Sequence, residues 1–107
     1  MYIFNTREIV LDSTTQDHNQ FKLVDLGQIE ILGFTVDSDG GVGVLNIIYR
    51  KFKEANPLLA ANDNLYQYVV HVVTLEKGTE CALGIACNYL GSFEFDGRTY
   101  LVFHNPA

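Results

Sequence analysis

The sequence predicts an α+β fold, in which a βββα unit is followed by a βββ unit and a mainly antiparallel sheet packs against one helix. Two observations predict it. Several segments have the alternating, β-branched pattern of strands, and one segment behind a glycine pair has the spacing of an amphipathic helix. The 107 residues suffice for a single domain, 1–107, which we divide into a first unit at 1–57 and a second at 65–103.

Three strands are expected before the helix, at 2–11, 20–26 and 28–36. The polar loop DSTTQDHNQ separates the first strand from the second. Gly27 separates or bends the second and third strands, and Gly33 is a candidate bulge. The run DSDGG that follows has the composition of a turn.

The segment after this turn decides the fold class. At about 100° per residue, one side of a helix would carry six apolar residues: Val44, Leu45, Ile48, Tyr49, Phe52 and Ala55. Strand spacing would instead place on one face three apolar residues: Leu45, Ile47 and Tyr49. That face would then continue into Lys51 and Lys53. The sequence therefore predicts a helix over 44–55, which Pro57 ends and in which Ile47 lies on the mostly polar side as a candidate partner contact.

The second half of the chain has three strand signals and no second helix. Residues 65–74 (LYQYVVHVVT) are rich in β-branched and aromatic residues and would place Tyr66, Tyr68, Val70, Val72 and Thr74 on one face of a strand. In 81–90 the odd positions are apolar and the even positions are small or polar. This pattern predicts a strand with one face in the core and a second face that a neighbouring backbone or a ligand could approach closely. Asp96 and Gly97, between FEF and RTY, form a two-residue hairpin signal.

The two cysteines predict a reducing environment. Cys81 and Cys87 lie six residues apart in one expected strand, so they would be roughly 20 Å apart and unable to form a disulfide. We interpret both as small core residues. No signal peptide, transit sequence or apolar run of about 20 residues is present, so we expect a cytoplasmic protein that does not enter a membrane.

The charge and the histidines exclude several functions. The formal net charge is −6 and Lys and Arg number only seven, which disfavours nucleic-acid binding. His18, His71 and His104 are far apart in sequence, and no HxH, HxxxH or CxxC motif is present, so we expect no metal and no cofactor. The acidic run DSDG fails as a calcium loop because Ile48 stands at its twelfth position.

Several motifs, taken in order along the chain, together resemble the C-terminal regulatory, dimerising domain of the 2-isopropylmalate synthase and citramalate synthase family. The stretch GVGVLNIIYRKF is similar to the family's GxGPVDALYRAI, and LYQYVVHVVT is similar to its LLDYSVHAVT. The stretches GTECALG and DGRTY are similar to its GTDALG, with one residue inserted, and its DGRTY. The resemblance covers 41–100 and is vague over 1–40. The chain departs from the pattern at Val44 and Asn46, where the family usually has proline and aspartate, and in lacking the second helix.

The resemblance implies a non-catalytic regulatory module that binds a branched-chain amino acid, leucine or isoleucine, and forms a homodimer. The catalytic barrel of the family is absent, so the chain itself would not be an enzyme. The amino acid's carboxylate would meet N–H groups at the helix start, its ammonium would meet polar acceptors, and its side chain would meet apolar walls. This hypothesis assigns nine ligand-binding residues: Asp39, Gly41, Gly43, Val44, Asn46, Ile47, His71, Ala82 and Gly84.

The same residues also have plainer structural interpretations. Gly41 and Gly43 would serve a turn or close packing, and His71 would be a hydrogen-bonded strand residue. The alternative function is a stand-alone interaction or inhibitor protein that keeps the scaffold but binds a protein partner. In that case a second protomer or a partner protein would cover apolar sheet surface around Tyr100 and Val102.

Overall fold

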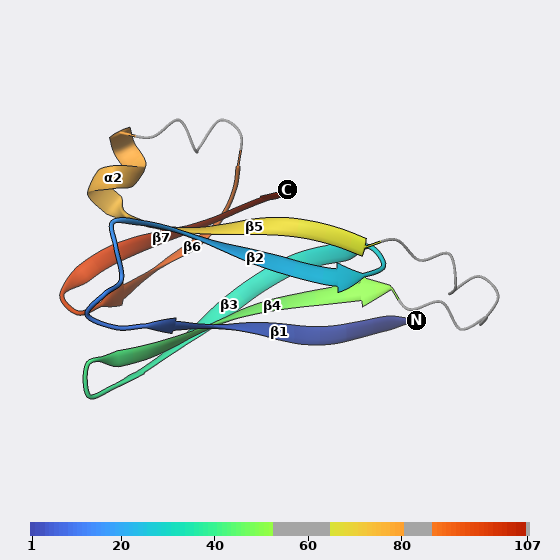
Figure 1. Ribbon diagram of the computed structural model, residues 1–107, viewed down its shortest axis with the longest axis horizontal. Helices are drawn as coiled ribbons and strands as arrows, with labels where there is room; N and C mark the ends of the chain where they lie inside the picture. The colour runs from blue at the N-terminus through green and yellow to red at the C-terminus, as the bar shows by residue number, and fades with distance from the viewer. Residues whose placement is uncertain (53–64, 81–86, 107) are drawn as a thin grey trace.

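The computed structural model describes residues 1–52, 65–80 and 87–106, which form two antiparallel sheets (Figure 1). The smaller sheet has the strand order β1-β4-β3 and the larger sheet has the order β2-β5-β7-β6. The elements are β1 (Tyr2–Leu11), β2 (His18–Leu26), β3 (Ile29–Asp39), β4 (Val42–Phe52), β5 (Leu65–Thr74), α2 (Leu75–Glu80), β6 (Asn88–Phe95) and β7 (Arg98–Pro106).

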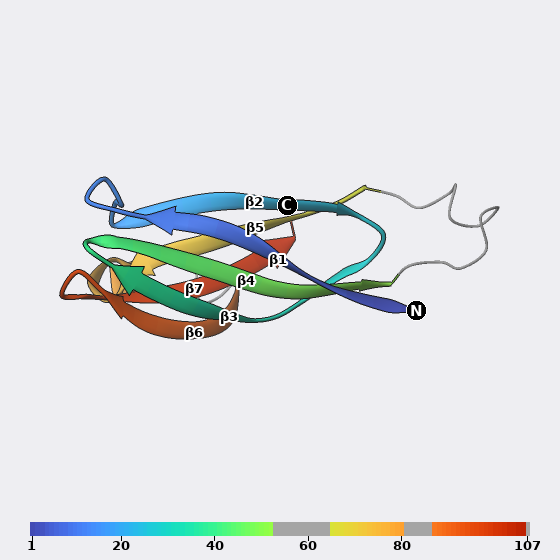
Figure 2. The same ribbon diagram turned by 90° about the horizontal axis from the view of Figure 1, so that it is seen from below.

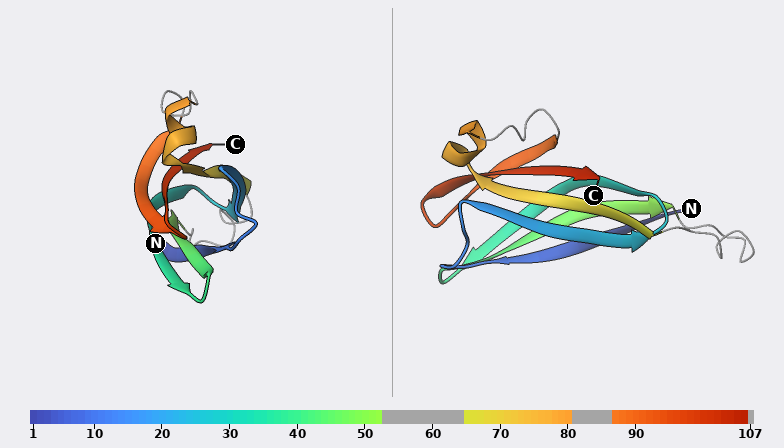
Figure 3. Two further views of the ribbon diagram at one scale, coloured as in Figure 1. Left: turned by 90° about the vertical axis from the view of Figure 1, so that its left-hand side faces the viewer. Right: turned by 45° about the horizontal axis from the view of Figure 1, so that its top comes forward.

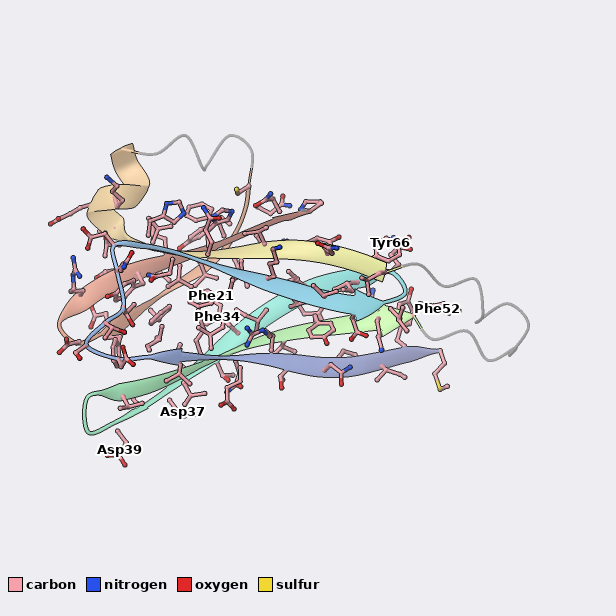
Figure 4. All side chains as sticks on the ribbon, in the orientation of Figure 1. Phe21, Phe34, Asp37, Asp39, Phe52 and Tyr66 are labelled. Atoms are coloured by element: carbon pink, nitrogen blue, oxygen red, sulfur yellow. The ribbon has the colours of Figure 1, made fainter. Side chains whose placement is uncertain are left out.

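The core lies between the two sheets, which face each other as two layers (Figure 3). Side chains alternate across each strand, so every strand gives one face to this core. The centre of the core is fully buried aliphatic side chains from both sheets: Leu45, Ile47, Val70, Val72 and Val102. Phe21 of β2 and Phe34 of β3 pack against it from opposite sheets (Figure 4). Helix α2 contacts β5 and β7, on the side of the larger sheet away from β1-β4-β3 (Figure 1).

The predicted helix over 44–55 is wrong, and with it the predicted α+β class. Residues 42–52 form β4, the central strand of the smaller sheet, which pairs with β1 on one side and β3 on the other. The inner face of β4 is buried at Gly43, Leu45, Ile47 and Tyr49. Pairing on both sides and burial of one face together outweigh a helix-like spacing. Among the described residues the only helix is α2, six residues long; residues 53–55 lie outside them.

Lys51 continues the inner face of β4, which is the feature that counted against a strand. The structure resolves this by pairing Lys51 with Asp25 of the opposite sheet at 2.7 Å, while the Tyr49 hydroxyl donates to the same carboxylate at 2.8 Å. Burial alone would raise the pKa of Asp25, but the hydrogen bonds from Lys51 and Tyr49 outweigh it and hold this pKa below its usual value. The charged end of β4 is therefore compatible with an inward-facing position.

Two glycine-containing turns close hairpins. Asp96 and Gly97 have φ angles of 52° and 73°, with Phe95 paired to Arg98, as the sequence predicts for a two-residue hairpin loop. Gly40 and Gly41 have φ angles of 60° and 83°, and they join β3 to β4 in the same way. The glycine pair therefore makes a hairpin turn and does not begin a helix.

The remaining strand predictions are mostly confirmed. Residues 2–11 and 65–74 form strands with those bounds, and the other two early strands extend to His18 and Asp39. A register shift between Ile31 and Gly33 confirms the bulge. Residues 81–86 lie outside the described ones, so the strand expected at 81–90 is described only from Asn88. Among the described residues there is no helix that could span a membrane.

Gly43 packs closely against the larger sheet. A Cβ atom at this position would lie 2.9 Å from Cε2 and 3.0 Å from Cδ2 of the buried Phe95 ring. We expect Gly43→Ala to lower the free energy of unfolding by about 1–3 kcal/mol, because the packed ring has to move. Urea unfolding at neutral pH measures this change.

Gly33→Ala is the matched control. Gly33 also lies in the smaller sheet, but a Cβ atom there would meet nothing within 4 Å. We expect the free energy of unfolding of the Gly33→Ala variant to differ from that of the wild-type chain by less than about 0.5 kcal/mol. Equal effects of the two substitutions would contradict the packing of β4 on Phe95.

Candidate functional site

The nine residues predicted to bind an amino acid do not form one site. Asp39 and Gly41 lie at the β3–β4 turn, where both are exposed. Val44 and Asn46 lie on the side of β4 that faces away from the core, and Gly43 and Ile47 lie on the buried side. These six residues therefore point in opposite directions from one hairpin.

The other three predicted residues are elsewhere. His71 lies in β5 of the larger sheet, on the side of that sheet away from the core, between the core residues Val70 and Val72. Ala82 and Gly84 lie outside the described residues. With no helix start at Gly43, the proposed cradle of N–H groups for a carboxylate is lost as well.

A shallow hollow of about 230 Å³ brings two of the predicted residues together. Its lining includes Asp39 and Gly41 from the β3–β4 turn and Asp96 from the β6–β7 turn. Two carboxylates at its rim would repel the carboxylate of an amino acid. The volume is also below the roughly 300 Å³ at which small-molecule sites usually begin. The hollow therefore does not serve as the predicted amino-acid site.

A hydrogen-bonded cluster lies on the side of the larger sheet away from the core. His18 Nε2 lies 3.1 Å from His71 Nδ1, and His71 Nε2 lies 2.7 Å from Asn105 Oδ1. Because an amide oxygen only accepts, His71 donates from Nε2, and when neutral it accepts at Nδ1 from His18. The Cys87 thiol donates to Asn105 Oδ1 at 3.4 Å. The thiol thus meets an amide and not an imidazole, so these described contacts form no cysteine–histidine nucleophile.

The Asp25, Tyr49 and Lys51 cluster is likewise engaged in holding the sheets together. Burial and the hydrogen bond to Asp25 raise the pKa of Tyr49 to about 12. A phenol with so high a pKa is a poor proton donor near neutral pH. Within the part of the chain that the structure describes, no group of three or more His, Cys, Asp or Glu side chains is arranged to hold a metal ion.

The feature that sequence reasoning missed is the exposed side of the β1-β4-β3 sheet, which we call the outer face. It is the side opposite the core, and β1, β4 and β3 are nearest to the viewer in Figure 2. At one end it carries three exposed aromatic residues, Tyr2, Phe4 and Phe52, with exposures of 54%, 64% and 42%. Tyr2 pairs with Phe52, ring edge to face at 5.7 Å, and Phe4 pairs with Arg50. We call this end the aromatic half.

The other end of the outer face is aliphatic and acidic. Val10 of β1 pairs with Val44 of β4, which pairs on its other side with Asp37 of β3. The next pair toward the turn is Val42 with Asp39. Asp37 and Asp39 lie toward the β3–β4 turn, and Phe52 lies at the opposite end of the molecule (Figure 4). We call this end, together with Glu8 of β1, the acidic half.

No helix or strand of the described residues covers the outer face, because α2 packs on the other sheet (Figures 1 and 3). A signal for this face was present in the sequence. On strand spacing, residues 42–52 have a second apolar side at Val42, Val44, Ile48 and Phe52, in addition to the core side. Apolar residues on both sides are typical of a strand that is buried on both faces, and the larger sheet covers only the inner side of β4.

No family model, no curated protein and no solved structure matches the chain. The comparisons give no link to the synthase regulatory domain, so that resemblance, like the amino-acid ligand and the homodimer that it implies, stays a prediction.

Two histidines make the stability depend on pH. Burial lowers the pKa of His104, whose Nδ1 is buried and has no hydrogen-bond partner. Burial lowers the pKa of His18 too, aided by the nearby His71 and Lys77. Both groups take up a proton more readily in the unfolded chain, whose histidine pKa is 6.5. Stability is therefore complete well above this value and is lost as the pH falls below it toward the folded pKa values.

We expect the urea concentration at the unfolding midpoint to decrease as the pH is lowered from about 7.5 to about 5.5, an interval in which most carboxylates do not yet titrate. His104→Phe keeps an aromatic ring beside Tyr68 and removes one of the two groups. The variant is expected to have a smaller loss of stability over this interval than the wild-type chain. An unchanged or steeper loss would contradict the burial of His104 in its neutral form.

Proposed function

We propose that this chain is a non-catalytic interaction protein that binds a segment of another protein through the outer face of its β1-β4-β3 sheet. The observation that carries the proposal is the side-by-side exposure of Tyr2, Phe4 and Phe52 at one end and Val10 and Val42 at the other. An exposed apolar surface on a sheet, bordered by charges, is typical of a protein–protein contact.

The sheet presents these side chains on a fixed backbone. β4 is hydrogen-bonded along its length, with β1 on one side over ten residue pairs and with β3 on the other. The inner faces of the same strands are locked in the core by Ile9, Leu45 and Ile31. A partner that docks here would lose little free energy in ordering the surface, and aromatic side chains are the residues that most often dominate binding.

The polar clusters of the described residues support the same proposal. The hydrogen bonds of the Asp25 cluster and those of the His71 cluster are each made within the cluster. Neither cluster opens into a hollow that the structure describes. The amino-acid-sensing alternative has lost the helix start on which its carboxylate site depended. Protein binding therefore uses the feature of the fold that the core and the clusters leave unused.

Selection from a displayed library of random short peptides tests the proposal. We expect the selected peptides to shift the backbone NMR signals of Phe4, Val44 and Ile48. Phe4→Ser is expected to weaken the affinity for these peptides by about tenfold or more, because it removes an exposed aromatic anchor. Phe4 is 64% exposed, so the variant keeps the core intact.

Val24→Ser is the matched control. Val24 is 44% exposed on β2, on the side of the larger sheet away from the core, so its truncation is also a surface change. We expect it to leave peptide affinity within about twofold of the wild-type value. Peptides that map to the larger sheet, or that bind Phe4→Ser as tightly as the wild-type chain, would overturn the proposal.

A further inference from the structure

We infer that the segment bound by the outer face is basic at one end, with Lys or Arg side chains over the acidic half and apolar side chains over the aromatic half. This inference rests on the proposed function and names the chemistry of its partner. It follows from how the charges of the face are distributed and from which of them are already paired.

Among the described residues, no cation pairs with the carboxylates of the acidic half. Glu8, Asp37 and Asp39 are exposed, and none of them forms an ion pair with any residue that the structure describes. Arg7, next to Glu8, pairs with the inward-facing Ile47 and donates to the backbone carbonyls of Lys22 and Glu8. Arg50 is on the outer face, in the other half. Its guanidinium is bound to Glu30 at 2.7 Å and lies 4.2 Å above the Tyr2 ring. The aromatic half is therefore electrically balanced, and the acidic half is not.

The register places these carboxylates on both sides of β4. Glu8 of β1 pairs with Asn46 of β4, and Asp37 of β3 pairs with Val44 of β4. Since adjacent strands are about 4.8 Å apart, the β1 and β3 backbones that carry these carboxylates lie roughly 10 Å from each other with β4 between them. A single segment lying along β4 would have carboxylates within reach on either side, which suits long, flexible Lys and Arg side chains.

A second copy of the chain fits this face poorly. Among the described residues of the outer face, each copy would bring Glu8, Glu30, Asp37 and Asp39 against the same set, and Arg50 would oppose them. Like charges that face each other across an interface cost affinity, and apposed carboxylates would lose water without gaining partners. The phosphates of nucleic acid or of an anionic membrane meet the same repulsion. A basic protein segment is the occupant that the charges favour.

The test uses peptides whose apolar residues come from the library selection and whose flanking residues are either all Lys or all Glu. Binding to the full chain is measured by fluorescence anisotropy at about 50 and 300 mM salt, which differ several-fold in ionic strength. We expect the Lys peptide to bind about tenfold or more tightly than its Glu counterpart at low salt, and the difference to shrink at high salt.

Charge reversal on the protein locates the effect. Asp37→Lys is expected to lower the affinity for the Lys peptide by about fivefold or more and to raise the affinity for the Glu peptide. Glu94→Lys is the matched control, because it makes the same change of net charge in β6 of the larger sheet. We expect it to change either affinity by less than about twofold.

Equal or tighter binding of the Glu peptide would overturn the inference while leaving the proposed function in place. A dimer in light scattering that Phe4→Ser dissociates would make a second copy the occupant, and it would overturn both the inference and the proposed function. If neither peptide binds the chain at any salt concentration, the proposed function itself is wrong.

Discussion

The structure depends on burying one face of β4 between the two sheets. Leu45 and Ile47 are completely buried there, and each such side chain contributes about 1.5–3 kcal/mol of hydrophobic stabilisation. β1 and β3 pair with β4 on either side, so their registers are fixed by the same burial. Because strand side chains alternate, fixing the inner face also fixes which residues are exposed. The outer face, to which binding is proposed, is therefore the other side of a strand whose inner side forms the core.

The two ends of β4 show how the sheets are joined where the aliphatic core stops. At one end Gly43 provides the space that the Phe95 ring of the larger sheet occupies. At the other end Lys51 and Tyr49 share the Asp25 carboxylate of β2. A close contact and a satisfied polar cluster thus extend the inner face of β4 over most of its length, with no helix needed to complete the core.

The sequence predicts most strands of the fold well and β4 poorly, for a physical reason. The strands at 2–11 and 65–74 and the turn at Asp96 and Gly97 were predicted correctly, because their β-branched, aromatic and turn residues give local signals. In β4 both sides are apolar, and the inner Leu45 and Tyr49 merge with the outer Val44 and Ile48 into a pattern that imitates a helix. The candidate site inherited this error. Contacts such as His18 with His71, 53 residues apart, have no local signal at all.

The most direct test of the central claim is the conformation of residues 42–52 in solution, measured by NMR. The structure predicts strand-type Cα and Cβ shifts throughout, with nuclear Overhauser effects between β1 and β4 that match pairs such as Val10 with Val44 and Thr6 with Ile48. Helical Cα and Cβ shifts, with nuclear Overhauser effects between residues three positions apart and none to β1, would contradict the strand assignment. Leu45 and Val44 would then share one side, and the outer face would not exist.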